Sequence, residues 1–134
     1  MNGQILIVED EPAVRMTMAR LLKMAGYEVT MAGDALAATT AAARDKPDLV
    51  LLDLGLPAGG GAVVIERLRN LVATSLTPVI VVTGQFVDSA RMHALAELGC
   101  DTVLMKPVVP EELLAAVDKA LGIDRVSDGR SGGP

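Results

Sequence analysis

Disulfide chemistry, aromatic stacking and long apolar runs are all scarce or missing in this chain of 134 residues. Its one cysteine, Cys100, has no second cysteine with which to form an internal disulfide. Aromatic residues make up 1% of the sequence, which removes the stacking platforms used by proteins that bind single-stranded nucleic acid. No apolar run approaches the ~18 residues of a membrane-spanning helix, so we expect no contact with a membrane.

Positive charge is in short supply as well. The chain has 12 Lys and Arg residues against 17 Asp and Glu residues, a net charge of -5, and no basic stripe that could neutralise phosphates. We therefore predict no direct binding to nucleic acid. The N-terminal Met1-Asn2-Gly3-Gln4 is not a basic segment followed by a signal-type apolar stretch, which favours a cytoplasmic protein.

What is present is enough apolar material for one domain, since 51% of the residues are hydrophobic. Short apolar runs alternate with longer segments of helical periodicity, a pattern typical of βαβ units around a parallel sheet. Continuous apolar runs favour central strands, whereas the alternating run at 28–31 favours an edge strand. The predicted strands are 5–8, 28–31, 49–52, 79–82 and 102–105.

Helix punctuation marks the segments between these strands. Pro12 suits a first helical turn and Gly26 a helix stop, while Asp34 and Asp88 are typical N-caps. Helices are predicted from Pro12 to that stop, and over 35–44, 61–71, 89–98 and 111–121. Beyond Gly122 the sequence turns polar and rich in glycine, so we expect a domain at 1–122 and a flexible tail or linker stub at 123–134.

Polar residues stand where several of the predicted strands end. Because the carboxyl ends of parallel strands share one rim, where ligands bind, we expect these side chains to converge there. Each alone has an ordinary structural explanation, since acids cap helices and a lysine near a strand end is usually solvated. The residues are Glu9, Asp10, Asp53, Thr83 and Lys106.

Crowded acids at that rim need a counter-charge. Two carboxylates ~5 Å apart repel by about 3 kcal/mol at an effective dielectric near 20, and a divalent cation relieves such repulsion. Oxygen ligands suit Mg²⁺, which usually keeps sites open for a phosphate. Lys106 offers a positive charge and Thr83 a hydroxyl to phosphoryl oxygens. Asp53, on the middle strand, is then the predicted phosphoryl acceptor.

The order of these motifs resembles the receiver domain of bacterial two-component response regulators and is similar to the chemotaxis regulator. The likeness covers residues 4 to about 122. It consists of Glu9-Asp10, Asp53 followed by Leu56-Pro57 and Gly61, Thr83-Gly84, and Lys106-Pro107. It implies an α/β, flavodoxin-like fold, with a five-stranded parallel sheet in the order 2-1-3-4-5 and helices on both faces.

The resemblance also implies a role for each residue. Asp53 would receive the phosphoryl group from a sensor histidine kinase or phosphotransfer protein and contribute to the Mg²⁺ site. Asp10 would bind Mg²⁺ directly, Glu9 largely through water, and Gly55 through its backbone carbonyl. Thr83 would hydrogen-bond the phosphoryl group, Lys106 would pair with it, and the Lys106–Pro107 peptide would be cis. Such a protein is no enzyme, apart from assisting its own phosphorylation and dephosphorylation.

Output in this family implies a face made by the fourth helix, the fifth strand and the fifth helix, which would bind a downstream protein or form a homodimer. By resemblance the candidates are Arg91, Met92, Leu95, Val103, Glu112 and Lys119. The chain departs from the family pattern at Val103, where many receivers have Tyr or Phe. A valine is too short and too stiff to report phosphorylation by exchanging rotamers, so we expect the output step to differ.

Other functions remain open at this stage. The chain could be an interaction module that works without phosphate, although a scaffold has no need for crowded acids. It could also be the N-terminal receiver of a longer regulator or of a hybrid kinase. A hydrolase of the haloacid dehalogenase kind is disfavoured, because that group needs an acid two residues after its nucleophile, where this chain has Gly55.

Overall fold

The computed structural model describes residues 3–57 and 60–125. Its strands are β1 (Gln4–Val8), β2 (Glu28–Ala32), β3 (Leu49–Leu52), β4 (Val79–Thr83) and β5 (Cys100–Met105). Its helices are α1 (Pro12–Met24), α2 (Ala35–Asp45), α3 (Gly60–Arg69), α4 (Ser89–Glu97) and α5 (Pro110–Leu121), with a short 3₁₀ helix, η1 (Val72–Thr74). Among the described residues, no helix has the length and apolar character needed to cross a membrane.

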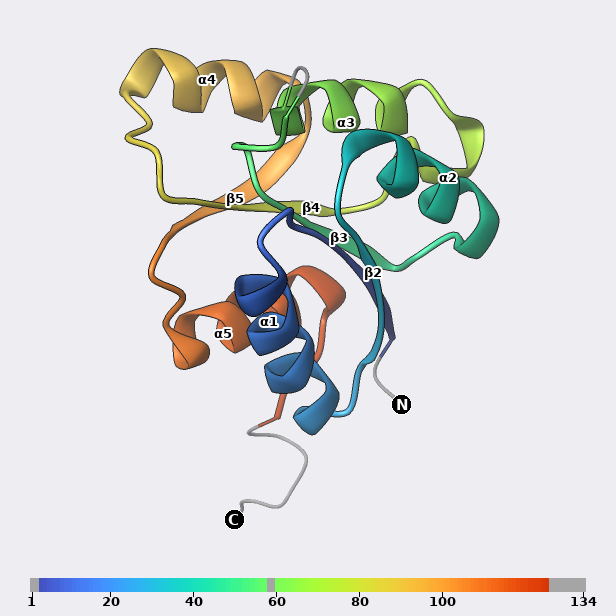
Figure 1. Ribbon diagram of the computed structural model, residues 1–134, viewed down its shortest axis with the longest axis vertical. Coiled ribbons are helices and arrows are strands. Elements are labelled where there is room, and N and C mark those ends of the chain that lie inside the picture. The colour runs from blue at the N-terminus through green and yellow to red at the C-terminus, as the bar shows by residue number, and fades with distance from the viewer. Residues whose placement is uncertain (1–2, 58–59, 126–134) are drawn as a thin grey trace.

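The strands form one parallel sheet in the order β2-β1-β3-β4-β5, which confirms the predicted fold. Helices α2, α3 and α4 cover one face of this sheet, and α1 and α5 cover the other (Figure 1). Strands β3 and β4 are buried along their whole length, as expected for strands with helices on both faces. The layered arrangement leaves the carboxyl ends of all five strands along one edge.

Two apolar cores hold the layers together, one on each face of the sheet. β1 shows how the alternation of side chains divides them. Leu6 and Val8 belong to the core under α2, α3 and α4, whereas Ile5 and Ile7 belong to the core under α1 and α5. All four side chains are 0–1% exposed, so β1 is fixed in register from both sides.

The predicted helix boundaries follow local chemistry. Asp34 and Asp88 are N-caps whose carboxylates accept backbone N–H groups of the first turn, at 2.7 and 2.8 Å. Pro12 and Pro110 open α1 and α5. Gly122 ends α5 in the left-handed region, at φ 70°.

The structure corrects two predicted boundaries. α3 ends at Arg69 rather than at residue 71, because Leu71 is extended and the chain continues into η1. β5 begins at Cys100, two residues before the predicted start, and its pairing with β4 is irregular there. The Asp101 carboxylate accepts the N–H of Val79 at 2.8 Å, so a side chain takes over one rung of the ladder.

The chain also stays folded beyond the predicted boundary at residue 122. The Arg125 guanidinium donates to the Asp118 carboxylate at 2.6 Å and to the backbone oxygen of Ala25 at 2.8 Å. Its Cζ lies 5.7 Å from the centre of the Tyr27 ring, and the Tyr27 hydroxyl donates to Asp118. The start of the predicted tail is therefore attached to α1 and α5, and residues 126–134 lie outside the described ranges.

Candidate functional site

The ends of β1 and β3 bring three carboxylates together. Glu9 follows β1 and Asp53 follows β3, and these two strands are paired neighbours. One carboxylate oxygen from each of Glu9, Asp10 and Asp53 lies within 4.8 Å of the others. Glu9 is 0% and Asp53 6% exposed, whereas Asp10 faces solvent. The acids converge as the strand order predicted.

Lys106 supplies the counter-charge inside this cluster. Its Nζ lies 2.8 Å from Oε1 of Glu9, 3.5 Å from Oδ2 of Asp53 and 3.8 Å from Oε1 of Glu11. The lysine follows β5, and its side chain extends across the ends of the sheet to reach the acids beyond β4. The Lys106–Pro107 peptide is cis, as the resemblance implied.

Burial and the pairing of Lys106 with the acids shift the pKa values of these groups in opposite directions. Burial raises the pKa of Glu9, the hydrogen bonds from Lys106 and the Glu11 N–H lower it, and the charge of Asp53 raises it again, so the net pKa is raised. Burial alone would lower the pKa of Lys106. The hydrogen bond to Glu9 and the charges of Asp53, Glu9 and Glu11 outweigh burial and raise that pKa. The lysine therefore stays charged at neutral pH.

The Asp53 carboxylate is held by the loop that follows it. The N–H of Gly55 donates to Oδ1 of Asp53 at 3.0 Å, and a Cβ at Gly55 would lie 3.5 Å from both carboxylate oxygens. On the other side, a Cβ at Gly61 would lie 2.6 Å from the backbone oxygen of Asp53. Glycine at both positions lets the backbone approach the acid closely without a side chain between them.

Thr83 ends β4, the strand between β3 and β5, and is fully buried. Its backbone oxygen accepts the N–H of Lys106 at 2.9 Å, and its hydroxyl oxygen accepts the N–H of Gln85 at 3.0 Å. A hydroxyl that already accepts one hydrogen bond can still donate its own proton. Thr83 is thus fixed beside Lys106 with a donor to spare.

Sequence reasoning missed several contributors to this site. The Arg15 guanidinium donates to the backbone oxygen of Glu9 at 2.7 Å, and the N–H of Glu11 donates to the Glu9 carboxylate at 3.2 Å. The Gln85 amide nitrogen lies 3.6 Å from where a Cβ of Gly55 would be. Nothing in the helical periodicity distinguishes Arg15 from Arg20 on the same helix, so no sequence signal could have singled it out.

The donor set fits Mg²⁺. The cluster offers carboxylate oxygens from three residues at one edge of the sheet, and hard oxygen donors are the ligands that Mg²⁺ prefers. Asp10 is exposed, so a hydrated ion could reach it directly. The buried Glu9 has a raised pKa that a nearby cation would bring down again.

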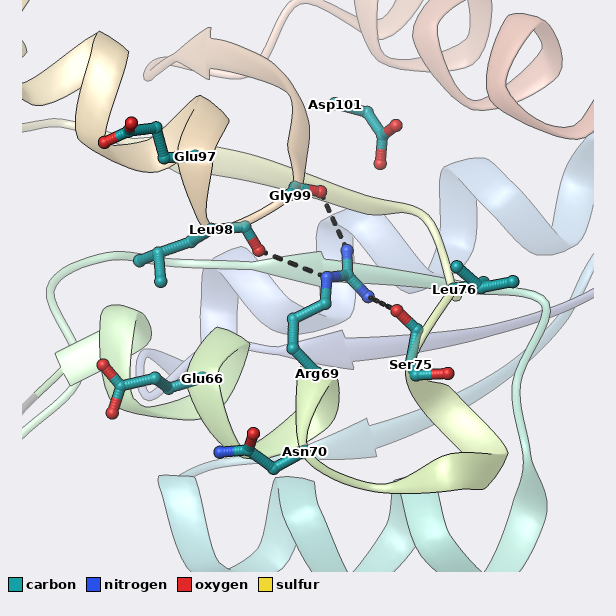
Figure 2. Close-up of a pocket in the computed structure, with 9 residues that line it drawn as sticks. All are labelled: Glu66, Arg69, Asn70, Ser75, Leu76, Glu97, Leu98, Gly99 and Asp101. Carbon is teal, nitrogen blue, oxygen red and sulfur yellow. Dashed lines mark hydrogen bonds between the residues drawn. The ribbon is translucent and has the colours of Figure 1, made fainter.

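A pocket in another part of the molecule does not belong to this site. A cavity of about 570 Å³ is lined by residues near the ends of α3 and α4 and by Asp101 at the start of β5 (Figure 2). Its floor is Arg69, whose guanidinium donates to the backbone oxygens of Gly99 at 2.8 Å and Leu98 at 3.2 Å. Strand starts lie opposite strand ends in a parallel sheet, so this cavity is remote from the acids.

The predicted output residues differ in their accessibility. Leu95 is only 3% exposed and belongs to the core under α2, α3 and α4, which contradicts its prediction as a contact residue. Val103 is half-buried, and Met92 is 42% exposed. The remaining candidates, Arg91, Glu112 and Lys119, are exposed.

Comparison with known proteins decides the family. The family model described as the response regulator receiver domain matches residues 5–118. The chain belongs to the response regulator receiver domain family. Receiver domains act in two-component systems as signalling switches and are generally not enzymes. The order of motifs and the five-stranded sheet of this receiver domain agree with that membership.

Individual relatives support the same conclusion. The receiver domain is 39% identical over 116 residues to the DNA-binding dual master transcriptional regulator RpaA of Synechocystis, an alignment that covers 85% of this chain and 47% of that protein. It is also similar to the response regulator receiver domain protein (CheY-like) of Methanospirillum hungatei, with 29% identity, a TM-score of 0.82, and coverage of 89% of this chain and 93% of that one.

A third relative bears on the metal. The receiver domain of a sensor histidine kinase from Pseudomonas aeruginosa, whose structure has a magnesium ion coordinated in the active site cleft, is 28% identical, with a TM-score of 0.81 and coverage of 90% and 98%. The present chain spans about half the length of the curated relatives it matches. The DNA binding that some of their names state belongs to those proteins.

Proposed function

We propose that Asp53 of this receiver domain accepts a phosphoryl group, with Mg²⁺, from a sensor histidine kinase or phosphotransfer protein, and that the domain then signals through protein contacts. The observation that carries the proposal is the arrangement around Asp53. Its carboxylate is held by the N–H of Gly55, lies 3.5 Å from the ammonium of Lys106, and shares the sheet edge with Glu9 and Asp10.

The transfer itself is a substitution at phosphorus. An Asp53 carboxylate oxygen forms a bond to the phosphorus of a phosphohistidine, and the phosphorus–nitrogen bond breaks, with its electron pair returning to the imidazole. Lys106, whose Nζ is 3.5 Å from Oδ2 of Asp53, would pair with an oxygen of the arriving group, and the Thr83 hydroxyl would donate to another. The domain thereby assists its own phosphorylation. In dephosphorylation, water attacks the phosphorus, the bond to the Asp53 oxygen breaks, and inorganic phosphate leaves.

The metal ligands under this proposal are Asp10 and Asp53 directly, Glu9 largely through water, and Gly55 through its backbone carbonyl. When bound, Mg²⁺ would neutralise part of the negative charge that develops on the transferred group. Each carboxylate of the set is already at the same edge of the sheet. Oxygen donors alone make up this set, which is the chemistry that Mg²⁺ favours.

The phosphodonor would dock beside Lys106. A groove of about 380 Å³ there is lined by Val14, Thr17 and Met18 from α1 and by Pro107 and Val108. Helix α1 carries three basic residues and no acidic one in a chain of net charge -5. An apolar groove next to the acceptor, with Lys106 in its lining and on a helix of positive charge, suits a partner that presents a phosphorylated histidine from an apolar surface.

The test uses a small donor in place of the partner. Wild type and Asp53→Asn are incubated with phosphoramidate and Mg²⁺, and their intact masses are measured. We expect a single phosphoryl adduct on wild type that Asp53→Asn and chelation of Mg²⁺ both abolish. An adduct that survives in Asp53→Asn would place the acceptor elsewhere, and no adduct at all would favour the interaction module that works without phosphate.

Several finer points belong to the same proposal. Output would use α4, β5 and α5, through a downstream protein or a homodimer, with exposed residues such as Met92 and Lys119 in contact. A place in the cytoplasm and the lack of direct contact with nucleic acid remain predictions from composition. So does the choice between a receiver that acts alone and the receiver of a longer regulator or hybrid kinase.

A further inference from the structure

We infer that Arg15 is a positioning residue for the metal ligands Glu9 and Asp10, an inference that rests on the proposed magnesium site. Arg15 lies in the first turns of α1 and is half-buried. Its Nη1 donates to the backbone oxygen of Glu9 at 2.7 Å, a short, charge-assisted hydrogen bond. The guanidinium thus acts on the backbone between the two acids rather than on a carboxylate.

The backbone oxygen of Glu9 belongs to the peptide that joins Glu9 to Asp10. Because a peptide unit is planar, a donor that fixes this oxygen also fixes the direction in which Asp10 leaves the strand. The rest of Glu9 is held as well. Its N–H donates to the backbone oxygen of Ala32 at 3.0 Å, and its carboxylate accepts the N–H of Glu11 at 3.2 Å. Arg15 completes this set at the side that faces Asp10.

The neighbouring loop makes room for the guanidinium. A Cβ at Gly33, in the connection between β2 and α2, would lie 3.3 Å from Nη1 of Arg15. The guanidinium therefore lies against the ends of both β1 and β2, which are paired strands. A side chain packed against two strand ends is restricted in its motion, so it can hold a backbone group at a constant position.

The charge of Arg15 and its positioning role predict opposite effects of its removal on Mg²⁺ affinity. As a positive charge near the acids, Arg15 repels a divalent cation, so its neutralisation alone would tighten Mg²⁺ binding. As a positioning residue, its loss would let the peptide between Glu9 and Asp10 turn and would weaken binding. Loss of an outer residue that orients metal ligands typically costs 10–100-fold in affinity.

The experiment measures Mg²⁺ binding to the metal-stripped full chain by titration calorimetry at fixed ionic strength, together with the melting temperature without metal. We expect Arg15→Met to raise the Mg²⁺ dissociation constant about tenfold or more. Arg15→Lys, which keeps the charge but has no planar fork, should raise it less. Arg20→Met removes an equal charge from the exposed side of the same helix and should leave it unchanged.

Equal or tighter binding in Arg15→Met would overturn the inference, and so would an equal loss in Arg20→Met. If Arg15→Met melts below the assay temperature, Arg15→Lys decides, and wild-type affinity in that variant would overturn the inference. A wild-type chain that fails to bind Mg²⁺ would refute the proposed site, and the inference with it. Normal binding by wild type and by Arg15→Met would refute the role of Arg15 alone.

Discussion

Replacing Lys106 by methionine should destabilise the metal-free protein, because two buried acids would lose their shared counter-charge. At an effective dielectric near 20, attraction from Nζ to Glu9 at 2.8 Å is about 6 kcal/mol and to Asp53 at 3.5 Å about 5 kcal/mol. Desolvation of the charges offsets much of this, and breaking a buried pair typically costs about 3–5 kcal/mol. We expect a net loss near the lower end, about 3 kcal/mol at pH 7, since Lys106 is 17% exposed.

The loss should depend on pH in a definite direction. The pKa of Glu9 in the folded protein is raised above 4.5, so the folded state holds this proton more tightly than the unfolded state does. Stability therefore falls as the pH rises through that pKa. Without Lys106, the hydrogen bond and the charge that lower the Glu9 pKa are gone, and the pKa rises further. The difference between variant and wild type should then be largest at neutral pH and shrink as the pH falls toward 4.5.

Melting curves from pH 4.5 to 8, with and without Mg²⁺, measure this effect. Lys119→Met is the matched control, because Lys119 is exposed on α5. At neutral pH we expect Lys106→Met to melt well below the control and to regain more stability than wild type when Mg²⁺ replaces the lost charge. Equal melting temperatures for the two variants, or a difference that does not change with pH, would refute the reasoning.

Further predictions concern other parts of the molecule. Gly61→Ala should lower the free energy of unfolding by about 1–3 kcal/mol and slow phosphorylation by a small donor, because the new Cβ would lie 2.6 Å from the backbone oxygen of Asp53. Phosphorylation of this variant at the wild-type rate would contradict the prediction. Arg69→Met should cost about 3 kcal/mol in urea denaturation, because several backbone oxygens lose their donor, yet leave the phosphoryl adduct intact. Tyr27 is the single tyrosine, and burial together with Asp118 raises its pKa to about 12. Phenolate absorbance should therefore appear near pH 12, and the free energy of unfolding should fall between pH 10 and 12. Asp118→Asn should lower the pH at which half of the phenolate has formed. A wild-type midpoint of this absorbance titration at pH 10 would count against the Tyr27–Asp118 bond.

The fold was predictable because buried parallel strands leave long apolar signatures. The runs at 49–52 and 79–82 predict β3 and β4 to within one residue, since both faces of these strands are covered. β5 was harder to place. Asp101 looks like a loop residue in the sequence, yet its carboxylate replaces a backbone partner of Val79 and lets the strand begin at Cys100.

The site was predictable only as far as strand ends determine it. A parallel sheet places Glu9, Asp53 and Lys106 at one edge, whatever their side chains do there. Which acid the lysine approaches depends on side-chain reach and burial, and Lys106 lies nearer to Glu9 than to Asp53. The contact of Arg15 could not be predicted from the sequence either, because its hydrogen bond to the backbone of Glu9 depends on the angle at which α1 leaves the sheet.

The contacts of Arg125 with Asp118 and Tyr27 have a practical consequence for the design of truncated forms of this protein. A chain that ends with α5 would keep every helix and strand but would lack Arg125. The buried Asp118 would then lose its charged partner, and one face of the Tyr27 ring would be exposed. Shortened versions should therefore retain the chain through Arg125. Fusion partners, too, are better joined after that residue than at Gly122.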